Sequence, residues 1–238
     1  MSDSRPQYRY GEPNWEMMGR WMHLAPEEDG PFWALNFMKY REVADYGEAG
    51  GPVRSGREAD DEYVPRGPLA AIGAMIAFGG DVTDQCAGDP AWDRIGIVRY
   101  PSRAAFFAMQ QRDDFKDQHV HKDAGMAFTI VMSTLPRGSA AAADDEGVLV
   151  LRVRRFTDGA DRPTGEPEPL VVFDVEGVIV GDERVWHEAR FDRVADLAAA
   201  EALSAPSAGV EEMQAVVIAP TVDQLIESIV TAPGAPAS

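Results

Sequence analysis

The sequence is poor in the residues from which many familiar sites are built. It has one cysteine, Cys86, and four histidines among 238 residues. A single thiol excludes a disulfide framework, and no second cysteine completes a C-x-x-C pair for metal or redox chemistry. Cys86 lies in a polar, glycine-rich stretch, which favours an incidental thiol over a catalytic one.

Several functional signatures are also absent. No apolar run approaches the roughly 18–20 residues that span a bilayer, and the polar start of the chain contains no apolar signal-peptide segment. We therefore expect a cytoplasmic protein without a membrane partner. The G-x-S-x-G, phosphate-loop, dinucleotide and H-E-x-x-H motifs are missing too. Their absence argues against hydrolase-triad, nucleotide-binding and zincin functions.

Positive charge is scarce. The chain carries 40 Asp and Glu residues against 22 Lys and Arg residues, a net charge of -18, and its only lysines are Lys39, Lys116 and Lys122. Nucleic-acid binding needs a basic face, so we expect no nucleic-acid partner. Surplus acid is usually a solvated surface, so the few cations of the first half are the more informative charges.

A polar segment of small residues divides the chain. Residues 136–146 separate two apolar, strand-like runs and are typical of a linker. The resulting division is an N-terminal extension or lid at residues 1–30, a domain with the candidate site at 31–136, a linker at 137–146, a second domain at 147–230 and a disordered tail at 231–238.

The strands of the first domain are recognisable from their aromatic and β-branched residues. Phe32–Tyr40 is aromatic-rich and follows a proline, and Arg94–Tyr100 and residues 127–133 are further apolar runs. A fourth strand is expected after Gly80. These four runs are interleaved with helical segments.

The helices are marked by their caps. Ser55 and Glu58 have the spacing of a capping box, which predicts a helix that prolines interrupt and that resumes over residues 69–78. Later helices are expected from Ser102 and over residues 113–123. The order is β-α-β-β-α-β, the ferredoxin-like pattern.

The second half repeats this pattern in weakened form. Residues 35–45 align without gaps to residues 151–161, and residues 98–106 align with one gap to residues 189–197. The first helix is replaced by a proline-rich loop. We predict an α+β protein in which two ferredoxin-like (βαββαβ) units pack as an intrachain dimeric α/β barrel, with the second unit as a structural partner.

Short motifs in the first half resemble those of a known family. They are, in chain order, Leu35-Asn-Phe-Met-Lys-Tyr-Arg, Ser55-Gly-Arg-Glu-Ala59, Gly79-Gly80, Trp92-Asp93, Arg99-Tyr-Pro-Ser-Arg103, Phe106 and His121-Lys-Asp-Ala-Gly125. The resemblance covers roughly residues 30–135 and is to a family of unknown function in the dimeric α/β-barrel (ferredoxin-like) superfamily.

The resemblance implies a fold and a set of candidate activities. The superfamily includes muconolactone isomerases, cofactor-free antibiotic-biosynthesis monooxygenases, EthD-like proteins and haem proteins such as chlorite dismutase and aldoxime dehydratase. Fold alone does not choose among them. This chain departs from the family in its interrupted first helix and its appended second repeat, which bears on whether it forms a simple homodimeric barrel.

His119 and His121 are the candidate catalytic residues, because imidazole exchanges protons near neutral pH. Two residues apart on a helix, they face different ways. His119 shares a face with Phe115 and Lys122, and Asp117 is placed to orient His121. The alternative is that both are surface or capping histidines near a helix C-terminus. Their spacing does not suit paired metal ligands, and we expect no metal site.

Three polar residues are candidates for substrate binding. Asn36 interrupts an apolar strand, so it either braces a loop or holds a substrate oxygen. Lys39 ends the same strand and is placed to meet a carboxylate or enolate, although a solvated strand end is the simpler reading. Arg57 follows a helix cap, where it joins an anion site or pairs with Asp60 or Asp61.

Asp93 and Tyr100 flank the strand Arg94–Tyr100 and complete the candidate substrate-binding set. Asp93 is placed to pair with a cation. Aromatic residues and methionines are also dense near the N-terminus, and a helix over residues 15–22 would present an apolar stripe. Core packing is the simpler explanation of that stripe, and the alternative is a lid over an apolar ligand cavity.

These residues lead to three functional hypotheses. The first is a cofactor-free enzyme of isomerase or lyase type, in which a histidine transfers a proton on a moderately apolar, oxygenated metabolite. The second is a non-catalytic ligand-binding or structural protein. The third is a haem-binding α/β-barrel enzyme or a cofactor-free monooxygenase. The expected partners are a small-molecule ligand and a second copy in a homodimer.

Overall fold

The computed structural model describes residues 8–63, 65–138 and 146–232. In the first half these are β1 (Glu12–Pro13), α1 (Trp15–Trp21), β2 (Phe32–Tyr40), a 3-10 turn (Gly47–Ala49), α2 (Gly56–Glu62), α3 (Arg66–Ala71), β3 (Met75–Ala87), β4 (Arg94–Tyr100), α4 (Arg103–Gln111), α5 (Asp113–Gly125) and β5 (Met126–Pro136). In the second half they are β6 (Val148–Phe156), β7 (Val171–Gly181), β8 (Glu188–Val194), α6 (Leu197–Leu203), β9 (Val210–Asp223) and α7 (Leu225–Val230).

Eight of the strands close into one antiparallel barrel. Their order is β7-β5-β2-β4-β3-β9-β6-β8, and β8 pairs back onto β7. The short β1 pairs with β7 beside the barrel. Closure gives each of the eight strands two neighbours, so the barrel leaves no open sheet edge.

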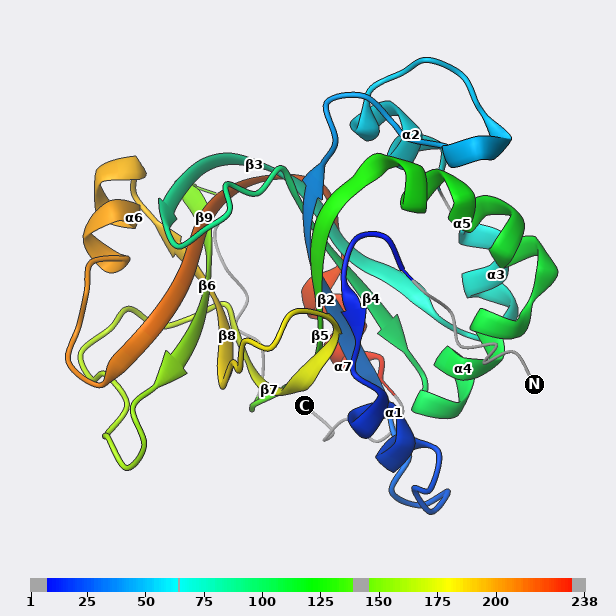
Figure 1. The fold of residues 1–238 in the computed structure, drawn as a ribbon. Helices are drawn as coiled ribbons and strands as arrows, with labels where there is room; N and C mark the ends of the chain where they lie inside the picture. Colours follow the sequence, from blue (N-terminus) through cyan, green and yellow to red (C-terminus); the bar gives the residue numbers. More distant parts are fainter. Residues whose placement is uncertain (1–7, 64, 139–145, 233–238) are drawn as a thin grey trace.

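The two halves of the chain supply four consecutive barrel positions each. In the first half the order is β5-β2-β4-β3, and in the second it is β9-β6-β8-β7. The halves meet along β3 and β9 on one side and along β5 and β7 on the other. Figure 1 shows that α2, α3, α4 and α5 all cover the outer face of the first half, whereas α6 lies at the outer side of the second.

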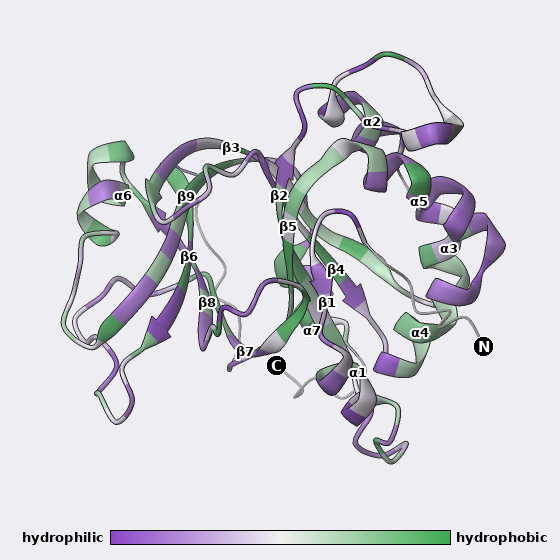
Figure 2. Ribbon diagram, in the orientation of Figure 1, coloured by the Kyte–Doolittle hydropathy of each residue, from purple (hydrophilic) through white to green (hydrophobic). Residues whose placement is uncertain are grey.

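The first sheet is buried on both faces, which explains the nearly continuous apolar run of β2. Trp33, Leu35 and Phe37 point into the barrel, where they join apolar residues from all eight strands. Ala34 and Met38 point outward into a second apolar cluster that is shared with the helices and α1. Figure 2 shows hydrophobic colours on the central strands and mostly hydrophilic colours on α5.

Most of the predicted elements have the expected place. β2 and β4 have the predicted bounds, and Ser55 and Glu58 form the capping box at the start of α2. Ser102 caps α4 by accepting from the amide of Ala105. The apolar stripe of α1 packs in the outer cluster, in agreement with core packing, and no described helix has the length and apolar character needed to cross a bilayer.

The helix predicted over residues 69–78 is present as far as Ala71, and its continuation to residue 78 is wrong. α3 ends at Ala71, and Gly73, with φ of 74°, turns the chain into β3 at Met75. Strand pairing outweighs the local helical pattern, because β3 has 13 residues and bridges β4 and β9. The predicted linker, residues 137–146, and the predicted disordered tail, residues 231–238, lie mostly outside the described residues, which exclude 139–145 and 233–238.

The helical layer depends on a contact between two glycines. A Cβ atom on Gly125 would lie 2.4 Å from the carbonyl oxygen of Gly56, which begins α2. We expect Gly125→Ala to lower the free energy of unfolding by about 1–3 kcal/mol, because backbone must move to admit the methyl group. Gly19→Ala is the control, since nothing lies within 4 Å of its added Cβ in α1; it should be neutral or stabilising by up to about 1 kcal/mol. Equal effects of the two substitutions in urea denaturation would contradict this account.

Candidate functional site: a cavity beneath the helices of the first half

A cavity of about 400 Å³ lies between the outer face of the first sheet and the helical layer. β2, β3 and β4 form its floor, and α2 to α5 and the N-terminal segment form its walls. Its apolar lining includes Leu69, Ile76, Tyr100, Phe106, Met109 and Phe115. The cavity has the size and the mixed lining typical of a small-molecule site.

The cavity exists because three neighbouring strands carry small residues in one row. Asn36 of β2 is directly opposite Gly96 of β4, and Gly96 is opposite Gly79 of β3. All three line the cavity. Because Gly96 and Gly79 lie side by side on adjacent strands, the outer surface of the sheet has no side chains at this place. In a fully packed sheet, side chains would fill that space. The hollow is therefore encoded in the strands, and the helices close it.

Lys122 of α5 and Asn36 form the polar centre of the cavity. The Lys122 Nζ is 3.4 Å from Asn36 Oδ1, and it lies 5.7 Å and 5.5 Å from the ring centroids of Tyr10 and Tyr63. Asn36 also donates to the carbonyl oxygen of Ala34 at 2.9 Å. Burial lowers the pKa of the Lys122 amine, and the nearby charge of Asp60 only partly opposes this.

Asp60 brings a carboxyl group to the same cavity from α2. Its side chain is buried and accepts a hydrogen bond of 2.7 Å from the hydroxyl of Tyr40. Arg94 Nη1 is 3.4 Å from the same oxygen. Burial raises the pKa of Asp60, although the hydrogen bond and the charges of Lys122 and Arg94 oppose the shift. Among the causes that act on the Asp60 pKa, burial is the largest, and it favours the protonated carboxyl group.

His119, one turn before Lys122 on α5, lies in the cavity wall as a neutral ring. Its Nε2 is 3.0 Å from the hydroxyl of Tyr10, and Phe115 and Tyr63 pack against the imidazole. Burial, reinforced by the charge of Lys122, lowers the pKa of His119 to about 3. Its Nδ1 is buried without a hydrogen-bond partner among the described residues.

Charged residues ring the rim of the cavity and pair with one another. Arg57 pairs with Asp81 at 2.5 Å, not with the adjacent Asp60 or Asp61 that the sequence suggested. Arg94 joins the same carboxylate at 3.1 Å and reaches Asp61 at 2.7 Å. The rim therefore holds α2 against β3 and β4.

The cavity brings together four of the residues predicted from sequence. Asn36, Arg57, Tyr100 and His119 all line it. Tyr100 is buried and stacks on Phe32, and its hydroxyl lies 3.8 Å from the sulfur of Met109. Burial raises the pKa of Tyr100.

Three predicted residues lie outside this cavity. His121 points away from His119, as the helical spacing indicated, and its Nδ1 is 3.0 Å from the hydroxyl of Tyr46. Its Nε2 is 3.7 Å from Glu62. Tyr46 and Glu62, and not Asp117 as expected, therefore orient the ring of His121. Lys39 and Asp93 pair with each other at 3.1 Å, and Asp93 also accepts from the backbone amide of Tyr40.

Lys122, Asp60, Tyr10 and Tyr63 were not singled out as site residues. Lys122 carried a signal, because it shares a helical face with His119 and lysine is rare in the chain. Asp60 follows the capping box of α2 by two residues, but nothing local distinguishes it from its acidic neighbours. Tyr10 belongs to the N-terminal extension expected at residues 1–30. Within the described part of this extension, Tyr8 and Tyr10 line the cavity, whereas α1 does not.

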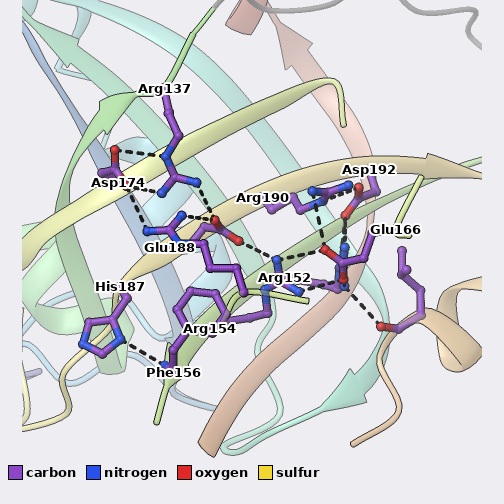
Figure 3. Close-up of polar contacts among 12 residues, drawn as sticks. Arg137, Arg152, Arg154, Phe156, Glu166, Asp174, His187, Glu188, Arg190 and Asp192 are labelled. Carbon is purple, nitrogen blue, oxygen red and sulfur yellow. Dashed lines mark hydrogen bonds and ion pairs between the residues drawn. The ribbon is translucent and has the colours of Figure 1, made fainter. Parts of the chain in front are cut away.

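The second half has ion pairs where the first has the cavity. Arg152 and Arg154 point outward from β6, and the gapless alignment places Arg152 where β2 has Asn36. Figure 3 shows these arginines converging on Glu188 and Asp192 of β8 and on Glu166 of the loop between β6 and β7. Arg152 lies 2.8 Å from Asp192 and 2.5 Å from Glu166, and Arg154 lies 2.5 Å from Glu188.

Further arginines reach the same carboxylates. Arg137 and Arg162 each reach Glu188 at 2.7 Å, and Arg190 reaches Asp192 at 2.7 Å. Burial acts to raise the pKa of Glu188, but hydrogen bonds from Arg154 and Arg137 outweigh it and hold the pKa below its usual range. These arginines therefore form ion pairs with carboxylates of the protein itself.

The described residues contain no group of three or more His, Cys, Asp and Glu side chains placed to hold a metal ion. Of the two candidate histidines, His119 lines the cavity, with its Nε2 facing the hydroxyl of Tyr10, and His121 does not.

Comparison with known proteins gives distant likenesses only. No protein-family model and no curated protein sequence matches the chain. A protein of unknown function from Rhodopseudomonas palustris, RPA0582, is 24% identical over 54% of this chain and 98% of its own, with a TM-score of 0.46. A "putative monooxygenase from Lactobacillus acidophilus NCFM" is 11% identical over 82% of this chain and 97% of its own, with a TM-score of 0.44. Likenesses at this level do not assign a family.

We expect His119 to stay neutral throughout the ordinary pH range. Its Cε1–H resonance, identified with His119→Phe, should not shift between about pH 8 and about pH 5. Below about pH 6.5 the His119 side chain is protonated in the unfolded chain but not in the folded protein, so the free energy of unfolding decreases as the pH falls. His119→Phe removes this contribution and should make the decrease smaller. A midpoint near 6.5 for His119 would contradict the buried placement.

We expect the Arg152 cluster to contribute strongly to stability. Arg152→Met leaves carboxylates of the buried cluster without their partner and should lower the free energy of unfolding by about 3–5 kcal/mol. Arg155→Met is the control on the same strand, because Arg155 is partly exposed and its carboxylate partners are 3.4 Å away; it should cost less than about 1 kcal/mol. Similar losses in urea denaturation would show that the cluster is not specially stabilising.

Proposed function

We propose that this protein is an enzyme that binds a moderately apolar, oxygenated small molecule in the cavity of the first half and moves a proton on it, in a reaction of isomerase or lyase type. The observation that carries the proposal is Lys122 beside Asn36 in a largely apolar cavity that Asp60 also lines. An apolar cavity with a few convergent polar groups suits a substrate with one oxygenated end.

Lys122 and Asn36 are proposed to hold the substrate oxygen. The Lys122 amine lines the cavity, where it lies 3.4 Å from the amide oxygen of Asn36. When a proton leaves a carbon next to a carbonyl group, negative charge develops on the oxygen. A preorganised cation in a site with little water stabilises that charge strongly.

Asp60 is proposed to carry the proton. Tyr40 fixes one carboxyl oxygen by a 2.7 Å hydrogen bond, and burial brings the pKa closer to the working pH, where an acid–base catalyst is most effective. His119 was the residue expected for this step. With a pKa near 3 its ring accepts protons poorly, so we propose it as a neutral hydrogen-bonding group that positions Tyr10.

We further propose that the barrel is an internal pair of ferredoxin-like units with a division of roles. The strand order within each half suits such a pair. The outer face of the second half carries the closed Arg152 cluster, which supports a structural role for that half. The homodimer stays a prediction, and barrel closure already takes place within one chain.

A ligand-binding protein without catalysis is the second candidate. The mostly apolar lining of the cavity favours it, because such a cavity binds small molecules whether or not a reaction follows. The two candidates differ in whether a bound carbonyl compound loses a proton.

Exchange of carbon-bound protons tests the proposal. Phenylacetone in D₂O, followed by NMR, should exchange its acidic C–H protons faster with the protein than with buffer alone. Asp60→Asn should reduce the catalysed rate by about 10²–10⁴-fold, the usual contribution of an acid–base group. Asp117→Asn, on the exposed face of α5, should leave the rate unchanged. Binding without exchange would support the non-catalytic candidate, and exchange that does not depend on Asp60 would refute the assigned role.

A further inference from the structure

Lys122 differs from the other two lysines in having no ion pair with any residue that the structure describes. Lys39 lies 3.1 Å from Asp93, and Lys116 lies 3.3 Å from Asp113 and 2.9 Å from the carbonyl oxygen of Gln111. For Lys122, no carboxylate of the described residues is recorded within 4.0 Å, and its hydrogen-bond contact is the 3.4 Å approach to Asn36. The chain has no further lysine.

The surroundings of Lys122 act on its charge in two directions. The amine lines the cavity and lies over the rings of Tyr10 and Tyr63, whose faces favour the ammonium form, whereas the removal of water favours the free amine. Burial lowers its pKa, which increases the fraction of amine with a free electron pair at neutral pH. Desolvation of a lysine in an apolar pocket is a recognised way to activate it as a nucleophile.

We propose that Lys122 is a covalent nucleophile that captures an aldehyde or a ketone as an imine. This inference rests on the proposed function and names the substrate class, a carbonyl compound with an apolar or aromatic body. Here Lys122 bonds to the carbonyl carbon, and the positive charge of the protonated imine replaces the contact between an ammonium group and the carbonyl oxygen. The aromatic and aliphatic walls of the cavity, among them Phe106, Met109 and Phe115, receive that body. The carbonyl carbon is then directed towards the Lys122 nitrogen.

The chemistry is balanced without a co-reactant. The nitrogen electron pair of Lys122 adds to the carbonyl carbon as the π bond of the C=O group breaks, and one proton passes from the nitrogen to the oxygen to give a neutral carbinolamine. A proton from the Asp60 carboxyl group converts the hydroxyl group into water, which leaves as the C=N bond forms, and the products are a protonated imine and the Asp60 carboxylate. Addition of water to the imine reverses these steps and returns both the free amine and the carbonyl compound.

The imine also explains how Asp60 removes a proton from carbon. A protonated imine withdraws electrons more strongly than the parent carbonyl group, so the neighbouring C–H bond becomes more acidic. After water has left, Asp60 is a carboxylate and can accept that proton. The Gly56–Gly125 contact holds α2, which carries Asp60, against the end of α5, which carries Lys122.

Reductive trapping tests the inference on the full-length protein. Phenylacetone and sodium cyanoborohydride should give one stable secondary amine, located by peptide mapping at Lys122. Labelling of Lys122 should be at least about tenfold faster than that of Lys39 or Lys116, although Lys116 is more exposed. Lys122→Arg keeps the cation and should abolish the adduct, whereas Lys116→Arg should leave it unchanged.

The comparison among lysines in the unaltered protein does not depend on the folding of any variant. 1-Phenyl-2-propanol, the alcohol that corresponds to phenylacetone, cannot form an imine. It should occupy the same cavity and protect Lys122 from labelling. Equal labelling of the three lysines, or no protection by the alcohol, would overturn the inference. If proton exchange depends on Asp60 but no adduct forms at Lys122, the imine is wrong and the proposed function stands. If neither binding nor exchange is seen, the proposed function fails as well.

Discussion

Closure of the barrel within a single chain is the constraint on which the rest of the structure depends. Because β7 and β8 pair and the two halves join along β3–β9 and β5–β7, every barrel strand is flanked on both sides. The interior is filled by one apolar cluster with residues from all eight strands. The cavity with Lys122 and Asn36 lies instead between the outer face of the sheet and the helices.

The two outer faces are used in opposite ways. In the first half, helices cover a sheet surface on which Asn36, Gly96 and Gly79 leave a hollow. In the second half, the arginines of β6 meet carboxylates of the chain itself and fill the corresponding surface. Buried charges are tolerable only when they are paired and hydrogen-bonded, which is why the second face is closed and the first can accept a ligand.

The electrostatics of the cavity follow from its partial isolation from water. Burial shifts Lys122 and His119 towards their neutral forms and Asp60 towards its protonated form. All three shifts have one physical cause, the loss of solvation of the charged form. A site in which burial lowers the pKa of an amine and raises the pKa of a carboxyl group is suited to proton transfer.

The sequence by itself determined the bounds of β2 and β4 and the helix starts at Ser55 and Ser102, because caps and apolar runs act locally. It also marked Asn36, Arg57, Tyr100 and His119, all of which line the cavity. It did not determine that residues 75–78 extend as a strand, since pairing with β4 and β9 decides that. Nor could it bring Lys122 and Asn36 together, which are 86 residues apart. Only the folded chain places them side by side, because helix packing over the sheet depends on contacts that no local pattern contains.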